Sequence, residues 1–130
     1  MEICFGSAGH ETALLFGDSY AHVHRAPTGP LLGLRPGPPS PFPQMSLNVR
    51  RDNLLAFVTH GSADARPAGQ VVLFGSSGVV QAVASAKVQR LDPAREVYCA
   101  AESRAQGNIA DYTSVVVLHL SRQEVVGSLW

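Results

Sequence analysis

One segment restricts the fold more than any other: residues 27–43, PTGPLLGLRPGPPSPFP, contain seven prolines and three glycines. Proline fixes φ and lacks a backbone N–H, so it cannot donate to a sheet ladder or continue a helix. We therefore expect an extended loop with polyproline II character. The segment separates residues 1–26 from residues 44–130. Because the first piece is too small to fold alone, we expect a single domain, residues 1–130, that contains the loop.

The remaining composition is typical of a globular domain. Hydrophobic residues make up 45% of the chain and charged residues 15%, which excludes a disordered, highly solvated chain. Ten basic and ten acidic residues give a net charge of zero, which argues against a nucleic-acid-binding protein. No basic region precedes an apolar stretch at the start, and no apolar run approaches the ~20 residues of a membrane span. We therefore expect a cytoplasmic or nuclear protein without a membrane segment.

The two cysteines, Cys4 and Cys99, stand in apolar surroundings far apart in the sequence. Two distant cysteines do not form a disulfide framework, and without a CxxC pair the chain has no zinc-ribbon pattern. We expect two buried free thiols and no cofactor.

Short apolar runs bounded by turn residues predict a mainly antiparallel sheet. Two of them surround Gly17-Asp18 and predict a hairpin within residues 12–25. The run of apolar residues within 113–120 predicts a central strand, in which His119 is a core histidine. The strands are expected at residues 1–5, 12–16, 20–25, 46–50, 54–60, 71–75, 96–102 and 113–120, with a short strand or helical turn at 123–130.

The one ambiguous element is residues 78–91. Gln81, Ser85 and Gln89 recur every four residues, which favours a helix that Asp92-Pro93 would end. Alternation of valine and alanine along the same stretch leaves a strand open. Together these elements predict an α+β domain with one or two helices and the long proline-rich loop.

The pattern Leu14-Leu15-Phe16-Gly17-Asp18-Ser19 resembles the first block of the SGNH/GDSL hydrolase family. That resemblance implies that Ser19 is a nucleophile delivered by a strand, with a histidine as its base. The family takes this base from an Asp-x-x-His motif near the C-terminus. Here Val116, not an aspartate, stands three positions before His119. The alternative that the residues themselves favour is an ordinary β-turn.

Three histidines are candidates for chemistry. His22 and His24 lie two apart, so on a strand they would project from one face and could share a metal ion. No acidic residue follows them before Asp52, and we expect a solvent-facing strand rather than a metal site. His60 ends a predicted strand and is a possible base.

Our leading hypothesis is a non-enzymatic protein-interaction module, a small subunit or adaptor of a larger complex. Low charge leaves the surface open to association with a protein partner or with further copies of the chain. The expected contact residues lie in the proline-rich segment and at the C-terminal end: Leu34, Arg35, Pro36, Phe42, Leu129 and Trp130. The alternative is a small hydrolase or ligand-binding protein that uses Ser19 with His22, His24 or His60.

Overall fold

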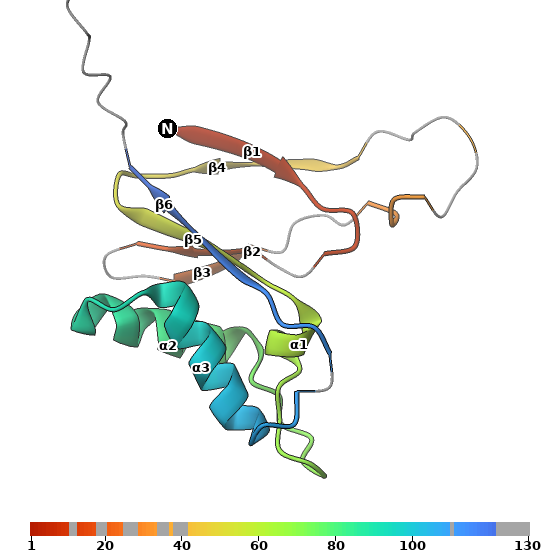
Figure 1. Cartoon of the computed structure of the whole chain (residues 1–130). Coiled ribbons are helices and arrows are strands. Elements are labelled where there is room, and N and C mark those ends of the chain that lie inside the picture. The colour runs from red at the N-terminus through yellow and green to blue at the C-terminus, as the bar shows by residue number, and fades with distance from the viewer. Residues whose placement is uncertain are drawn as a thin grey trace, which may run out of the picture.

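Within the described residues, a four-stranded antiparallel sheet forms the middle layer of the structure (Figure 1). Its order is β3 (Ala21–His24), β2 (Ala13–Phe16), β5 (Asn53–Val58) and β6 (Val115–Leu120). The computed structural model describes residues 1–10, 13–17, 21–24, 29–33, 37, 42–109 and 111–121, and only the backbone of residues 22–24.

The two inner strands of this sheet, β2 and β5, are buried on both faces. Leu14 lies opposite Ala56, Leu15 opposite Leu55, and Phe16 opposite Leu54. Successive side chains of a strand point to opposite faces, so an unbroken apolar run supplies both layers of core. This is why the runs ALLF and NLLAFV become the centre of the sheet.

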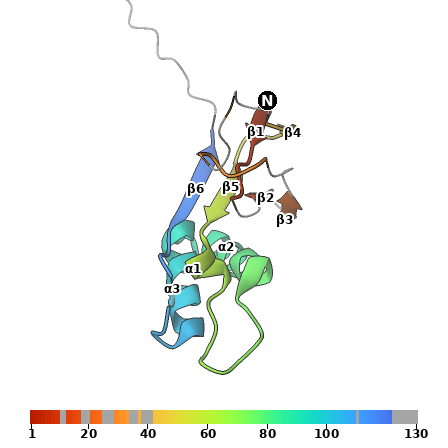
Figure 2. The same cartoon turned by 90° about the vertical axis from the view of Figure 1, so that its right-hand side faces the viewer.

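A two-stranded pair covers one face of the sheet. Strand β1 (Glu2–Gly6) pairs antiparallel with β4 (Gln44–Asn48), and Ile3 lies opposite Leu47. Figure 1 shows the pair above the sheet, and Figure 2 shows the same layers from the side. The core between these two layers consists of buried Ala13, Leu15, Leu47, Val49 and Leu55. The two strands that cover this core thus come from different parts of the chain, β1 from before the proline-rich segment and β4 from after it.

Three helices cover the opposite face: α1 (His60–Ala63), α2 (Gly75–Gln89) and α3 (Pro93–Ala105). Each long helix presents one completely buried stripe. Val79 and Val83 of α2 and Val97 and Ala101 of α3 have no exposed surface. None of these helices is long and apolar enough to cross a membrane.

The turn between α2 and α3 is fixed by backbone and side-chain caps. Arg90 closes α2 in the left-handed conformation, with φ 56° and ψ 40°. Asp92 begins α3: its carboxylate accepts hydrogen bonds from the N–H groups of Ala94 at 2.9 Å and Arg95 at 3.5 Å. Pro93 takes the first helical position, where a missing N–H costs nothing.

The α+β fold class and several elements are confirmed. Strands β2 and β3 pair antiparallel as the predicted hairpin requires. The ambiguous residues 78–91 lie largely in a helix, α2, whose N-cap is Phe74.

Two predicted strands are wrong. Residues 96–102 lie inside α3, because the Asp92-Pro93 pair begins this helix as well as following α2. Residues 71–74 form neither helix nor strand, and Gly75 already belongs to α2. Val71 and Val72 are 87% and 68% exposed, so their apolar character reflects no burial. The strand predicted at residues 71–75 is therefore absent from the structure.

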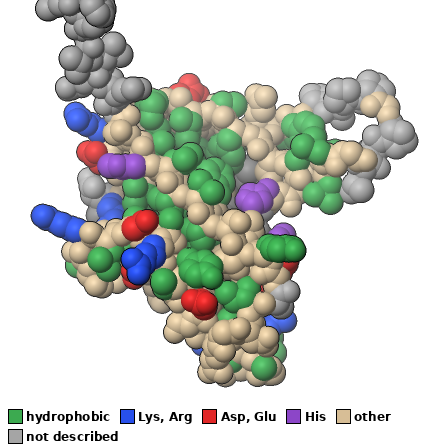
Figure 3. Space-filling view, in the orientation of Figure 1, with side chains coloured by type: hydrophobic (Ala, Val, Ile, Leu, Met, Phe, Trp, Pro, Cys, Tyr) green, Lys and Arg blue, Asp and Glu red, His purple; other side chains and the backbone are tan. Residues whose placement is uncertain are grey.

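Three burial predictions are also wrong. Cys4 and Cys99 are exposed. Among the described strands β6 lies at the edge of its sheet, not at its centre. Figure 3 shows hydrophobic side chains gathered on the surface that faces the viewer. The exposed fraction of Leu118, a residue of β6, is 45%. His119, on the same edge strand, is an exposed histidine rather than a core one.

The described residues of the proline-rich segment form neither helix nor strand. The Gly29 N–H donates a 2.6 Å hydrogen bond to the Ser7 carbonyl. A Cβ on Gly29 would collide with the ring of Phe42, so the two ends of the segment lie against each other. Leu31 and Leu32 are exposed.

Candidate functional site

The structure describes only part of the residues predicted from the sequence to carry function. Outside the described residues lie Ser19, Leu34, Arg35, Pro36, Leu129 and Trp130. Phe42 is described and is half-buried against Gly29. The contact surface proposed for these residues therefore stays a prediction.

The predicted histidines occupy two different elements. His22 and His24 belong to strand β3. Their backbones lie opposite those of Leu15 and Ala13 of strand β2. Their side chains lie outside the described part of the chain. His60 is the exposed first residue of α1, directly after the end of β5.

The described residues contain no group of three His, Cys, Asp or Glu side chains that could hold a metal ion. Asp64 and Asp111 line one cavity of about 260 Å³ together with Arg66 and Asn108. Two carboxylates and an amide supply oxygen atoms of the kind that Mg²⁺ and Mn²⁺ prefer, but not a complete ligand set.

The junction between β5 and α1 is closely packed and polar. The Thr59 hydroxyl donates to the Tyr112 carbonyl at 2.8 Å and accepts from the Ser114 N–H at 2.9 Å. A Cβ at Gly61 would lie 2.5 Å from the carbonyl oxygens of Asp111 and Tyr112. Position 61 therefore requires glycine, and this contact ties α1 to the segment that leads into β6.

One cavity, about 590 Å³, lies between the start of α2 and the end of α3. Ser77 and Gln81 line it from α2, and Ser103 and Arg104 line it from α3. The Arg104 guanidinium donates to the Val72 carbonyl at 3.2 Å. Its polar groups thus include a guanidinium that already binds the loop before α2.

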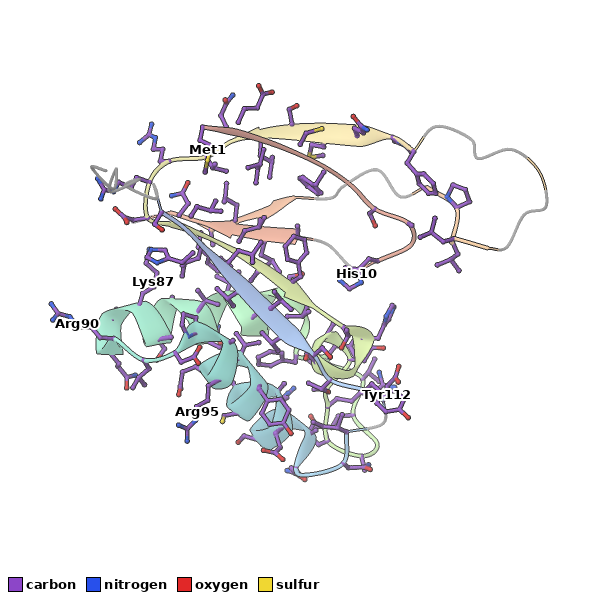
Figure 4. All side chains as sticks on the ribbon, turned by 45° about the horizontal axis from the view of Figure 1, so that its top comes forward. Met1, His10, Lys87, Arg90, Arg95 and Tyr112 are labelled. Atoms are coloured by element: carbon purple, nitrogen blue, oxygen red, sulfur yellow. The ribbon has the colours of Figure 1, made fainter. Side chains whose placement is uncertain are left out.

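A second cavity, about 410 Å³, lies where the α2–α3 turn meets the sheet, and we call it the corner groove. Its residues come from three separate parts of the chain: Asp52, Leu54, Ala86, Lys87, Arg90, Leu91, Asp92, Pro93, Ala94, Val117 and His119. Figure 4 shows Lys87 directed from α2 toward the sheet and Arg90 directed outward at the end of the helix.

The Lys87 ammonium donates a 2.6 Å hydrogen bond to the carbonyl of Gly17, the residue that directly follows β2. This bond joins residues 70 positions apart and ties α2 to the end of β2. At the other side of the groove, His119 Nε2 lies 3.7 Å from Asp52 Oδ1. Both side chains of this pair are more than 60% exposed, so it adds little stability.

Sequence analysis missed the corner groove. One local signal was present, because Lys87 is the only lysine in the sequence. The association of Asp52, Arg90 and His119 has no local signal, since it depends on the packing of α2 against the sheet.

One protein family matches most of this chain. A family model described as Stage II sporulation protein E (SpoIIE) matches residues 1–121. Among curated proteins, none matches the sequence.

Solved structures share the fold. The phosphatase domain of the cell-fate determinant SpoIIE from Bacillus subtilis, presoaked with Mn, superposes with a TM-score of 0.61 at 12% identity. The match covers 95% of this chain and 52% of that one. A structure of RsbU and RsbW domains from Mycobacterium tuberculosis superposes with a TM-score of 0.61 at 21% identity, covering 89% of this chain and 32% of that one. This chain thus spans about half or less of the solved chains it matches.

These findings correct the leading sequence hypothesis. The hypothesis of a non-enzymatic interaction module or adaptor subunit is contradicted by the family match and by the structural neighbours, one of which is a phosphatase domain. The composition misled us because low surface charge and apolar strands describe the fold of the domain and carry no information about its chemistry.

Proposed function

The chain belongs to the Stage II sporulation protein E (SpoIIE) family, and we propose on that premise that it acts in the hydrolysis of a phosphate monoester. The observation that carries this proposal is the family match over residues 1–121, which includes every described element. The neighbouring phosphatase domain supports it through the shared fold, which by itself leaves function open.

The reaction sets clear chemical demands. A water oxygen forms a bond to phosphorus, the bond from phosphorus to the ester oxygen breaks, and the leaving oxygen takes up a proton. Negative charge on the phosphoryl oxygens must be stabilised by fixed donors or cations while this occurs.

Manganese is the metal named with one neighbouring structure. The described residues do not fit a manganese site, because they hold no group of three potential ligands. The acidic residues outside the described part are Glu11, Asp18 and Glu124.

Paired substrates test the proposal. p-Nitrophenyl phosphate and p-nitrophenyl acetate release the same chromophore, so they differ only in the bond that is cleaved. We expect the purified chain to hydrolyse the phosphate above the uncatalysed rate and to leave the acetate at that rate. Parallel reactions with Mn²⁺, with Mg²⁺ and with a chelator measure any dependence on metal.

Two results would refute the proposal. One is phosphate hydrolysis at the uncatalysed rate in all three reactions. The other is cleavage of the acetate alone, which would mean carboxyl-ester chemistry.

A further inference from the structure

The corner groove combines a buried apolar floor with a charged rim. Leu54 and Ala86 are 8% and 0% exposed, and half-buried Val117 completes the floor. A volume of about 410 Å³ lies within the range of pockets that bind small ligands or single side chains. An apolar side chain therefore fits the floor.

The acidic groups of the rim are already engaged within the chain. The Asp92 carboxylate accepts hydrogen bonds from two N–H groups at the start of α3. The Asp52 carboxylate lies 3.7 Å from the imidazole of His119. Among the residues that the structure describes, no other acidic residue lines the groove.

The two basic side chains of the rim, Lys87 and Arg90, differ in whether they have a hydrogen-bond partner within the described residues. The Lys87 ammonium is bound to the Gly17 carbonyl. Arg90 makes no side-chain hydrogen bond or ion pair with the part of the chain that the structure describes. Its backbone is nevertheless fixed, because the N–H groups of Arg90 and Leu91 donate to the Lys87 and Ala86 carbonyls. The rim of the groove thus contains one guanidinium, that of Arg90, whose charge no described side chain pairs with, on a turn whose backbone is fixed by hydrogen bonds.

A guanidinium binds carboxylate and phosphate groups through paired N–H donors. We propose that the corner groove docks an acidic peptide segment, with an apolar side chain on the floor and a carboxylate beside Arg90. Resting on the proposed function, the segment belongs to the phosphoprotein substrate, and the groove is the place where the enzyme holds that protein.

Binding is measured with peptides that a phosphatase cannot cleave. The ¹⁵N-labelled chain is titrated with acetyl-Leu-Glu-Glu-amide and with acetyl-Leu-Lys-Lys-amide, and amide shifts are followed by NMR. We expect the glutamate peptide to shift amides at residues 52–54, 86–94 and 117–119. The lysine peptide should bind at least about threefold more weakly.

Two variants separate the guanidinium from general charge. Arg90→Asn removes the cation and keeps a residue that tolerates the left-handed conformation. Arg95→Gln removes a cation from the exposed face of α3, outside the groove. We expect Arg90→Asn to weaken glutamate-peptide binding at least about threefold and Arg95→Gln to leave it unchanged.

Equal binding by both peptides, shifts confined to other surfaces, or equal binding by Arg90→Asn and Arg95→Gln would each overturn the proposal. Because neither peptide is a phosphate ester, this experiment is independent of catalysis. A chain that hydrolyses phosphate but fails here keeps its proposed function and loses this groove. A chain that binds here but hydrolyses nothing loses the function, and the groove stays a peptide site without a phosphoprotein substrate.

Discussion

The hydrogen bond from Lys87 to Gly17 yields the most specific prediction for stability. Lys87→Met keeps the aliphatic stem and removes the ammonium, leaving the carbonyl of buried Gly17 without this donor. A hydrogen bond to a charged group contributes about 1.5–3 kcal/mol, so the free energy of unfolding should fall by that amount. For 130 residues, an unfolding entropy of about 2.1 cal/mol/K per residue converts this loss to a Tm about 5–11 °C lower.

Urea unfolding followed by far-UV circular dichroism measures this change, and a thermal scan gives Tm. The matched control is Arg95→Met, which makes the same kind of replacement at an exposed helical position. It should change the free energy of unfolding by no more than about 0.5 kcal/mol. If Lys87→Met unfolds like Arg95→Met, the long-range link between α2 and the end of β2 contributes nothing, and our reasoning about this contact is wrong.

Three further predictions concern the helices and the thiols. Asp92→Ala removes the cap of α3 and should cost about 1 kcal/mol in urea unfolding, whereas Asp92→Ser should retain most of the stability; equal losses would argue against capping. Val83→Ala, at a position without exposed surface, should cost about 2 kcal/mol, and Val88→Ala, at 84% exposure, less than about 0.5 kcal/mol. Exposed Cys4 and Cys99 should both react with a thiol reagent in the folded protein, and protection of either until denaturant is added would contradict its exposure.

Strands β2, β3 and β5 could be predicted from the sequence, because their signals are local. The Gly17-Asp18 turn between two apolar runs predicts the β2–β3 hairpin, and the run in residues 54–60 predicts a strand, which the structure places at Asn53–Val58. The position of β6 could not be predicted in the same way. Val115 and Val117 pack against the helical core while Val116 stays half exposed, a difference that only the neighbouring layers create.

The helix α3 was predictable, but its signals were given the wrong weight. Val97, Ala101 and Ala105 recur every four residues and are completely buried, and Asp92-Pro93 is a typical helix start. The sequence prediction ends the preceding helix at this pair and places residues 96–102 in a strand, whereas the pair begins α3. Tight helical hairpins need a stop signal and a start signal within a few residues, and here they coincide.

The corner groove was beyond prediction from the sequence, because residues 52–54, 86–94 and 117–119 meet only in the folded chain. The function escaped prediction for a different reason. Composition constrains solubility and fold, whereas chemistry depends on sites that one fold can carry in many versions. The proposed phosphatase function rests on the family match over residues 1–121 and on the phosphatase domain that shares the fold.

One measurement tests the central claim most directly. A phosphoserine peptide is incubated with the purified chain, and ³¹P NMR follows the monoester and inorganic phosphate in the same sample. We predict that the monoester signal falls while inorganic phosphate rises by the same amount, at a rate proportional to the concentration of the chain. An unchanged monoester signal with and without Mn²⁺, in a sample whose chain is folded by circular dichroism, would contradict the account.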